Sequence, residues 1–448
     1  APTRRAAPVT RISGAAVDSG SGGDVRIGFT VRPGTGRAAG RACRYNRGLA
    51  LLSCRTIMSS LPQPSADALA QSARLLETIE AELAAAAGWI PFARYMELAL
   101  YAPGLGYYSG GARKFGPGGD FITAPELTPL FGQALAAQVE QVMRASAPAL
   151  IEVGAGTGLL AADLLLELER RGCVPDRYGI LELSGELRER QFDTLADKAP
   201  HLAARVQWLD ALPERFAGAV VANEVLDVMP VHLVVSRAEG LFERGVAIAT
   251  DAAGIRRLCW ADVPAAGAVA EGARALALPV PQSGEYVTEL NLAGKAWVAA
   301  WAERLHAGAL LLIDYGYPRA EYYLPSRSGG TLLCYYRHHA HGDPFLWPGL
   351  NDITAFVDFT AVAEAGFEAG LDVQGYTTQA QFLFNCGVLE CLERRGARES
   401  ADYIRAARAV QRLTAPQEMG ELFKVIALSR AIDGPLLGFA RGDRTHAL

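Results

Sequence analysis

The chain lacks both a long apolar segment and a paired cysteine motif. Among its 448 residues, no uninterrupted apolar run reaches the roughly 18 residues that a helix needs to cross a bilayer, so no membrane span is predicted. Its seven cysteines are odd in number and scattered, and none forms a CxxC pair. This spacing favours free thiols in a reducing compartment over a disulfide scaffold or a zinc site. The cysteines are Cys43, Cys54, Cys173, Cys259, Cys334, Cys386 and Cys391.

Acidic residues are scarce at the start of the chain. Residues 1–57 hold ten Arg and two Asp, a net charge of +8; since the whole chain carries −5, residues 58–448 carry −13. An acidic body argues against general nucleic-acid binding and is compatible with a basic protein substrate. Residues 1–57 show no sustained period, and we expect a disordered basic extension or a wrongly assigned start upstream of Met58. A transit peptide and a basic interaction arm are the alternatives.

The remainder of the chain has the composition and pattern of an α/β protein. Half of all residues are hydrophobic (50%) and 20% are charged, which suits one large or two modest globular domains. Short apolar runs alternate with helix-patterned segments, which predicts a doubly wound, mostly parallel sheet. We expect N-terminal helices before this sheet and a β-rich subdomain inserted in it. The expected regions are 1–57 (extension), 58–145 (helices and a lid), 146–232 (first half of the sheet), 233–294 (inserted subdomain), 295–432 (second half, with a substrate loop over 318–351) and 433–448 (tail).

The periodicity also predicts individual elements. Helices are expected over 66–87, 91–100, 123–143, 295–306, 354–367 and 379–413. Strands are expected over 177–183, 205–210, 217–227, 308–317, 371–379 and 421–430. Residues 233–288 show short alternating segments between Gly and Pro turns, which predicts antiparallel strands there. Residues 318–351 are expected to form one long loop.

The most informative segment is ALIEVGAGTGLLAADLL, residues 149–165. An apolar run leads into Gly154, Gly156 and Gly158, and a helix-patterned segment follows, so the segment predicts a strand, a tight turn and a helix N-terminus. The spacing is GxGxG, with Leu159 where a dinucleotide fingerprint has its third glycine. Together with Glu152 just ahead of the turn, this favours S-adenosylmethionine (SAM) over NAD.

Acidic residues follow the next three predicted strands. Glu182 ends the second strand, where a carboxylate can accept hydrogen bonds from two ribose hydroxyls. Asp210 ends the third strand and suits an adenine amino group, and Asn223-Glu224-Val225-Leu226-Asp227 ends the fourth. Each acid alone could be a solvated helix cap. Because the carboxyl ends of parallel strands meet at one edge of a sheet, their order along the chain favours a nucleoside site.

Several separated motifs now resemble one family. EVGAGTG, ANEVLDVMPVH, YVTELN, LLIDYGYP, DITAFVDF and LFKVIALSR are similar to the MidA (NDUFAF7-like) family, over about residues 75–430. The resemblance implies a class I (Rossmann-like) SAM-dependent methyltransferase. It also implies symmetric dimethylation of an arginine on a protein, a subunit of respiratory complex I. The expected location is the cytoplasm for a bacterial chain and the mitochondrial matrix for a eukaryotic one, and a homodimer is left open.

Arginine methylation makes a specific demand on the acceptor site. The guanidinium is planar and permanently charged, so carboxylates must hold it and favour charge on the nitrogens that do not attack. We predict Glu224 as the guanidinium clamp, with Asp227 second and Asn223 beside them. The predicted cofactor contacts are Glu152, Gly154, Ala155, Gly156, Gly158, Glu182, Leu183, Asp210 and Asn223, and the family resemblance implies Thr123 and Pro125 as well. The predicted substrate contacts are Asp120, Glu126, Glu289, Asn291 and His338.

Some of these residues have simpler interpretations. Thr123 and Glu126 have the spacing of a helix capping box. Glu289 and Asn291 are expected to begin a helix, where they could act as caps. His338, His339 and His341 lie close together in the expected loop, but their surroundings lack ligand spacing for a metal, so we predict none.

Three other functions remain open from the residues. An NAD(P)-dependent oxidoreductase would need the glycine that is absent at position 159. An assembly factor could retain SAM without turnover, although the intact NEVLD acids argue against it. A small-molecule methyltransferase is the third alternative, and the large segment 233–288 favours a macromolecular partner over it by analogy.

Overall fold

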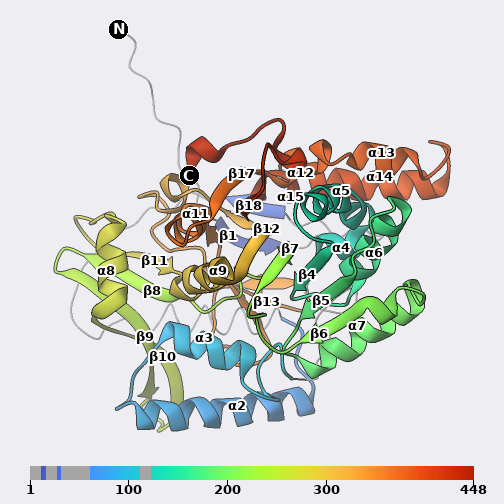
Figure 1. The fold of residues 1–448 in the computed structure, drawn as a ribbon. Helices are drawn as coiled ribbons and strands as arrows, with labels where there is room; N and C mark the ends of the chain where they lie inside the picture. The colour runs from blue at the N-terminus through green and yellow to red at the C-terminus, as the bar shows by residue number, and fades with distance from the viewer. Residues whose placement is uncertain (1–11, 17–27, 32–60, 111–122) are drawn as a thin grey trace. The chain divides into compact units, whose positions relative to one another are not determined.

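The computed structural model describes residues 12–16, 28–31, 61–110 and 123–448 (Figure 1). The chain divides into two compact units. Unit 1 takes in Ala1–Gly110, Pro230–Leu290 and Ala320–Ala355, and unit 2 takes in Gly111–Met229, Asn291–Arg319 and Phe356–Leu448. Within the described ranges, no helix combines the length and the apolar character needed to span a membrane.

Unit 2 is built on one twisted sheet. Its strands follow the order β17-β18-β12-β7-β4-β5-β6, and all neighbours pair in parallel except β18, which is antiparallel to both β12 and β17. The predicted doubly wound, mostly parallel sheet is therefore confirmed. The strands are β4 (Ala149–Val153), β5 (Arg177–Leu181), β6 (Val206–Leu209), β7 (Phe216–Asn223), β12 (Leu305–Tyr317), β17 (Asp372–Thr378) and β18 (Phe423–Arg430), with the short β16 (Val357–Asp358) beside β12.

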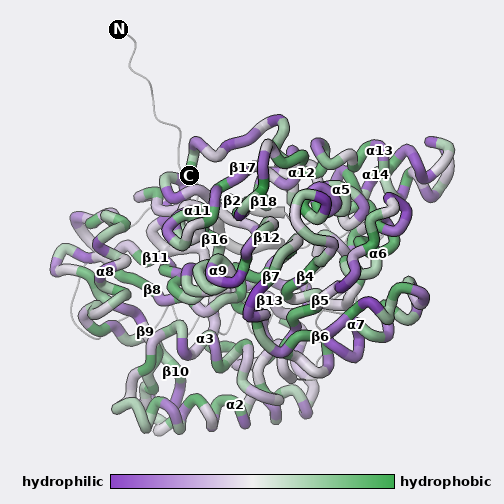
Figure 2. The backbone as a smooth tube through the Cα atoms, viewed as in Figure 1, coloured by the Kyte–Doolittle hydropathy of each residue, from purple (hydrophilic) through white to green (hydrophobic). Residues whose placement is uncertain are grey.

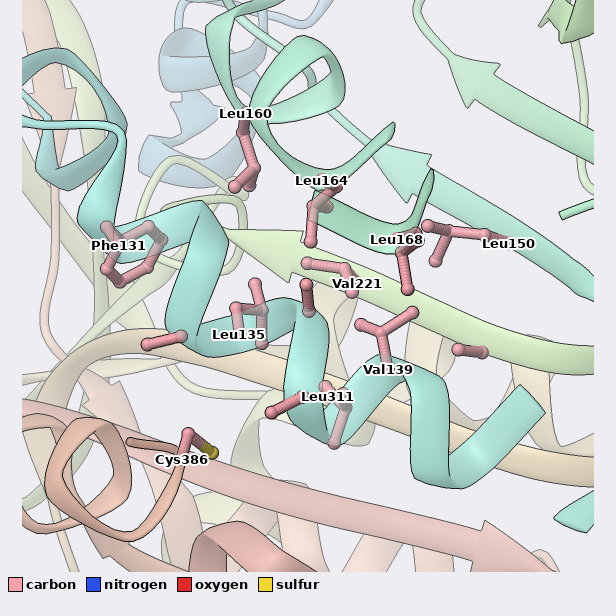
Figure 3. Close-up of a cluster of buried hydrophobic side chains, with 14 of the residues drawn as sticks. Phe131, Leu135, Val139, Leu150, Leu160, Leu164, Leu168, Val221, Leu311 and Cys386 are labelled. Atoms are coloured by element: carbon pink, nitrogen blue, oxygen red, sulfur yellow. The ribbon is translucent and has the colours of Figure 1, made fainter. Parts of the chain in front are cut away.

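Helices cover both faces of this sheet because its central strands are apolar on both sides. Along β12, Leu311 and Ile313 join one buried cluster while Leu310 and Leu312 join the other. The first cluster includes residues of α5, α6 and α12–α14, and the second includes residues of α9 and α11. Figure 3 shows Leu135 of α5 and Leu164 of α6 facing each other in the first cluster. The helices of unit 2 are α4 (Ala124–Leu127), α5 (Leu130–Ala145), α6 (Leu159–Arg170), α7 (Gly185–Lys198), α9 (Leu292–Arg304), α11 (Phe359–Glu368), α12 (Gln379–Asn385), α13 (Val388–Glu393), α14 (Ala401–Thr414) and α15 (Met419–Leu422), with 3₁₀ turns at Ala203–Arg205, Leu437–Phe439 and Thr445–Ala447.

Three predicted helices of unit 2 are interrupted or shorter than expected. The helix expected over 379–413 divides into α12, α13 and α14, and Gly387, in the left-handed region (φ 80°), separates the first two. The expected helix over 123–143 is broken between α4 and α5, because Pro129 restricts the preceding Thr128 to an extended backbone (φ −169°). The expected helix over 354–367 begins only at Phe359, where the Asp358 side chain accepts a hydrogen bond from the Ala361 N–H at 3.1 Å. The preceding residues pair as short strands instead.

Unit 1 contains a mostly antiparallel sheet with the strand order β10-β9-β8-β11, and β3 (Ile90–Pro91) pairs with β9. The strands β8 (His232–Arg237), β9 (Gly240–Thr250) and β10 (Arg256–Pro264) confirm the antiparallel strands predicted in this region. β11 (Tyr286–Leu290) pairs with β8 and contains Glu289, so the prediction that Glu289 begins a helix is wrong. The strand is buried along most of its length and contains the β-branched Val287 and Thr288, which favour a strand over a helix and explain the difference.

The expected loop over 318–351 is also more ordered than predicted. It contains β13 (Leu333–Tyr336) and β14 (His339–His341), which form a three-stranded sheet with β15 (Asp352–Thr354). Arg337 and His338 form the turn between β13 and β14, both with positive φ (45° and 63°). A hairpin with such a short turn leaves little periodicity to detect in sequence.

The helices of unit 1 include α2 (Ala66–Ala85), α3 (Phe92–Tyr101) and α8 (Gly267–Ala275). Hydrophobic and hydrophilic segments alternate along α2 (Figure 2), and Leu75, Ile79 and Leu83 form its buried face. Leu69, nearer the start of the helix, is exposed. The short helix α10 (Arg319–Tyr322) begins at the unit boundary. In the extension over 1–57, the described residues are β1 (Ile12–Ala16) and β2 (Gly28–Val31), which pair antiparallel.

Candidate functional site

The glycine turn lies in unit 2 between β4 and α6. Gly154, Gly156 and Gly158 all have positive φ (65°, 52° and 83°), a conformation that favours glycine. Gly158 is the N-cap of α6, so the free N–H groups of the first helical turn face the carboxyl edge of the sheet. Ala155 is 6% exposed within the turn. The turn therefore offers an approach to a polar ligand without side chains in the way.

The side chain of Gln191, on α7, connects this turn to the end of β5. Its Nε2 donates to the Gly156 carbonyl at 3.1 Å and to Glu182 Oε2 at 3.2 Å, while its Oε1 accepts from Trp208 Nε1 at 2.9 Å. Glu182 Oε1 accepts a bond from the Ser184 N–H at 2.9 Å. Burial raises the pKa of Glu182 above its ordinary value, and the hydrogen bonds from Ser184 and Gln191 oppose only part of this rise. The predicted ribose acid is thus held in a fixed position beside the turn.

The two other predicted residues at this edge have exposed side chains. Leu183 is 80% exposed, which is unusual for an apolar residue and leaves its surface available to a flat apolar group. The Asp210 side chain is 88% exposed and pairs with Arg188 Nη2 at 2.7 Å. Arg188 also donates to the carbonyls of Glu182 and Leu209, at the ends of β5 and β6. This arginine therefore joins the two strand ends at which a ribose and an adenine are predicted.

Glu152, in contrast, lies inside the protein. It is 2% exposed, and its Oε2 accepts a hydrogen bond from the Tyr178 hydroxyl at 2.5 Å. Burial raises the pKa of Glu152 to about 7, and the Tyr178 bond opposes this rise. A direct cofactor contact stays a prediction for Glu152, whose side chain is buried and bonded to Tyr178 of β5.

The raised pKa of Glu152 predicts a pH-dependent stability. From its ordinary pKa near 4.5 up to about 7, the native carboxyl keeps a proton that the unfolded chain has lost, so stability falls as pH rises. Between about pH 5 and about pH 8, we expect the free energy of unfolding of the wild type to fall by roughly 3 kcal/mol on account of Glu152. Glu152→Gln stays neutral, so its free energy of unfolding should lack this fall. Urea unfolding at the two pH values measures it. The exposed Glu214→Gln is the control, and parallel pH profiles for Glu152→Gln and the wild type would contradict the prediction.

The fourth strand end forms a strained turn. Glu224 directly follows β7 and has φ 53°, in the left-handed region that costs a non-glycine residue about 1 kcal/mol. Its N–H donates to the Ile313 carbonyl of β12 at 2.9 Å. Asn223 Nδ2 donates to Glu224 Oε1 at 3.1 Å, while the buried Asn223 Oδ1 has no hydrogen-bond partner among the described residues. A buried acceptor of this kind suits a donor from a ligand.

Asp227 differs from Glu224 in its surroundings. It is 3% exposed, and its Oδ2 accepts a hydrogen bond from the Tyr315 hydroxyl. Burial raises the pKa of Asp227. Only Oδ2 of Asp227 is engaged by Tyr315, and its buried Oδ1, like Asn223 Oδ1, has no hydrogen-bond partner among the described residues. Glu224 is less buried than Asp227, which favours Glu224 as the acid that meets a substrate.

Sequence reasoning missed several residues that build this site. Asp314, on β12, accepts bonds from the backbone of the turn after Glu224, and Tyr315 contacts Asp227. An aspartate inside the apolar run LLLIDYGY was the available signal for Asp314. Gln191 and Arg188 lie on α7, whose polar sequence has the appearance of a solvated helix, so no signal pointed to them.

Three further predicted residues lie near the start of α4 in unit 2. Thr123 is the N-cap of α4 but makes no side-chain cap bond, so the capping-box interpretation is not observed. Pro125 and Glu126 lie in the first turn of α4. Asp120 falls outside the described residues. Their cofactor and substrate roles stay predictions.

Asn291 contacts the NEVLD turn as well as a helix end. Its Nδ2 donates to the Leu226 carbonyl at 3.2 Å, and its Oδ1 accepts from the Gly294 N–H at 2.6 Å as the N-cap of α9. Asn291 is thus a helix cap that also holds the turn.

In unit 1, Glu289 anchors the segment after α10. Its Oε1 accepts from the N–H groups of Thr331 and Leu332 at 2.7 and 2.9 Å, and its Oε2 accepts from the Tyr322 hydroxyl at 3.0 Å. These bonds favour a structural role over a substrate contact for Glu289. His338 lies in the turn between β13 and β14.

No metal centre emerges from the residues that the structure describes. No group of His, Cys, Asp and Glu in these ranges is arranged to hold a metal ion. His341 pairs with Asn351 Oδ1 at 3.1 Å, and burial lowers the pKa of His341, so its neutral form is favoured. All five cysteines in the described ranges are free thiols.

Comparisons with known proteins agree with this geometry. Residues 130–377 match the Methyltransf_28 family model, whose description is an S-adenosyl-L-methionine-dependent methyltransferase. The mouse protein arginine methyltransferase NDUFAF7 is 30% identical over 376 residues, 76% of this chain and 81% of that protein. The Drosophila melanogaster homologue is 28% identical over 398 residues, 82% of this chain and 87% of that protein.

A solved structure extends the similarity to the fold. A Burkholderia thailandensis protein, bound to S-adenosyl-homocysteine, is 55% identical with a TM-score of 0.83, and the match covers 87% of this chain and all of that one. The class I methyltransferase fold and the SAM cofactor implied by the motifs are confirmed. With the family model matching more than half of the sequence, the chain belongs to the Methyltransf_28 family of SAM-dependent methyltransferases.

Proposed function

We propose that this methyltransferase transfers methyl groups to an arginine guanidinium of a protein, with Glu224 as the guanidinium clamp. The observation that carries the proposal is the turn after β7, where Glu224 is held in a left-handed conformation at the carboxyl edge of the sheet. Strain of this kind persists only where the surroundings impose it, and it clusters at functional sites. The named activity of the NDUFAF7 relatives supports the same acceptor.

The residues of this chain divide the work of the reaction. SAM supplies an activated methyl group when bound. The glycine turn and Glu182 orient the donor, and Glu224 receives the guanidinium in a charge-assisted pair. Holding two guanidinium nitrogens leaves the third to attack and stabilises the charge during transfer. The new nitrogen–carbon bond would form as the carbon–sulfur bond breaks, S-adenosyl-homocysteine would leave with the electron pair, and the attacking nitrogen would lose its proton to solvent during or after transfer. Asn223 Oδ1, buried without a partner in the described structure, accepts a hydrogen bond from SAM or from the substrate arginine.

The finer parts of the proposal concern the target and the location. We propose symmetric dimethylation and a subunit of respiratory complex I as the target, as the family resemblance of the motifs implies. The mitochondrial names of the eukaryotic relatives support the matrix for a eukaryotic chain. A bacterial chain is placed in the cytoplasm. A homodimer is part of the proposal and is tested by the molar mass of the purified chain in solution.

The experiment uses the full chain and methyl-labelled SAM. The purified protein is incubated with lysate of its host, labelled proteins are identified by mass spectrometry, and hydrolysed residues are separated. We expect labelled symmetric dimethylarginine on a small number of proteins, with a complex I subunit among them. Label found only in small molecules, or on residues other than arginine, would overturn the arginine proposal.

A further inference from the structure

A buried aspartate lies at the carboxyl end of β12. The residues before it, Leu310, Leu311, Leu312 and Ile313, are at most 1% exposed, and Asp314 itself is 1% exposed. A carboxylate in such surroundings is costly unless hydrogen bonds replace its water. The energetic cost of Asp314 therefore has to be offset by specific partners.

Those partners are the backbone of the NEVLD turn. Asp314 Oδ2 accepts hydrogen bonds from three consecutive N–H groups, those of Val225, Leu226 and Asp227, at 3.2, 2.9 and 3.2 Å. Its Oδ1 accepts from the Tyr315 N–H at 2.9 Å. Three successive N–H groups that converge on one carboxyl oxygen form a compact nest, which fixes the backbone that supplies them.

The turn fixed in this way begins one residue after Glu224. The Ile313 carbonyl accepts from the Glu224 N–H, and the next residue of β12 holds the three residues that follow. Two adjacent residues of one rigid strand therefore bind both sides of Glu224. This arrangement explains how a non-glycine residue keeps φ 53°.

The following residue of the same strand closes the turn from its other end. The Tyr315 hydroxyl donates to Asp227 Oδ2, and the Tyr315 ring packs edge-on against Phe356 and Phe423 with centroids 5.2 and 5.4 Å away. The ring is thus fixed by its neighbours, and its hydroxyl fixes Asp227.

We propose that Asp314 and Tyr315 are positioning residues for methyl transfer: they fix the Val225–Asp227 turn and thereby direct the Glu224 carboxylate. The inference rests on the proposed role of Glu224. Neither side chain needs to meet a substrate, because both act through the turn. A purely structural role would stabilise the fold without any specific effect on the rate.

The test compares Asp314→Asn with Asp358→Asn in the full chain. Asp358 is also a buried aspartate of unit 2, 9% exposed, and caps α11 by accepting from the Ala361 N–H. The rate of S-adenosyl-homocysteine formation is measured against SAM concentration in host lysate. For Asp314→Asn we expect kcat to fall by about 10- to 100-fold with the KM for SAM unchanged, because a small misplacement of the clamp is enough. Asp358→Asn should keep its kcat.

A double variant separates positioning from stability. If Asp314 acts through Glu224, adding Asp314→Asn to Glu224→Gln should lower kcat no further. Tyr315→Phe, which keeps the ring and all Asp314 bonds, should also lower kcat, and it tests the inference even if Asp314→Asn fails to fold. An additive double variant, or kcat values for Asp314→Asn and Tyr315→Phe equal to the wild type, would overturn the inference. The identity of the labelled acceptor tests the proposed function separately, so either can fail alone.

Discussion

Replacing Glu224 by Gln should abolish most methyl transfer while leaving cofactor binding intact. Gln has nearly the same shape and meets the same φ 53°, so the turn should keep its form and only the negative charge is lost. A permanently charged guanidinium then loses its charge-assisted partner at the moment of reaction. We expect the rate to fall by about 100- to 1,000-fold, the range found for loss of one preorganised electrostatic contact.

Two measurements check this result. Methyl transfer from labelled SAM into host protein gives the rate, and isothermal titration with S-adenosyl-homocysteine gives the affinity, which should stay within about threefold of the wild type. Glu214→Gln, an exposed change of the same type in unit 2, is the matched control and should behave as the wild type. Wild-type turnover by the Glu224 variant would rule out the clamp.

The second large effect is expected at the glycine turn. In Gly158→Ala, the added Cβ would lie 2.9 Å from the Gln191 Cα, a backbone atom that cannot simply rotate away. The positive φ of 83° adds strain for alanine. Because Gln191 also bonds to Gly156 and Glu182, moving it displaces both the turn and the predicted ribose acid. We expect affinity for S-adenosyl-homocysteine to fall on the order of 100-fold, or about 3 kcal/mol.

A second glycine separates the clash from the backbone strain. Gly172, after α6, has φ 66° but nothing within 4 Å of an added Cβ. Gly172→Ala should therefore lose about 1 kcal/mol of stability and keep its affinity. Titration calorimetry and thermal unfolding of both variants measure the difference. Equal affinities for the two variants would show that contact with Gln191 does not matter for binding.

The sequence was sufficient to predict the sheet and its ligand edge, because both follow from local patterns. Residues 149–151 of β4, 219–222 of β7 and 309–313 of β12 are short apolar runs, and a polar residue follows each directly: Glu152, Asn223 and Asp314. The broken helix at Pro129 was also readable from the restriction that a proline places on the residue before it. Its effect was overlooked because the helical period continues on both sides.

The parts of the site that escaped prediction depend on contacts between distant segments. Gln191 is an ordinary polar residue on a helix until α7 packs beside the glycine turn. The sequence around Glu289 is also compatible with a helix start, and only the structure shows that Glu289 lies in β11, paired with β8. The bonds from its side chain to Thr331 and Leu332 join segments that are distant in the sequence. The positive φ of Glu224 cannot be read from its residue type at all, because it is imposed by β12.

One contact in unit 2 has a consequence for redesign. A Cβ added at Gly154 would lie 3.1 Å from Val225 Cγ2, so the glycine turn and the NEVLD turn pack directly against each other. If a different turn replaces the NEVLD turn, the glycine turn limits the size of the side chain at position 225. Variants with a new methyl-acceptor specificity should therefore exchange the glycine turn and the NEVLD turn together.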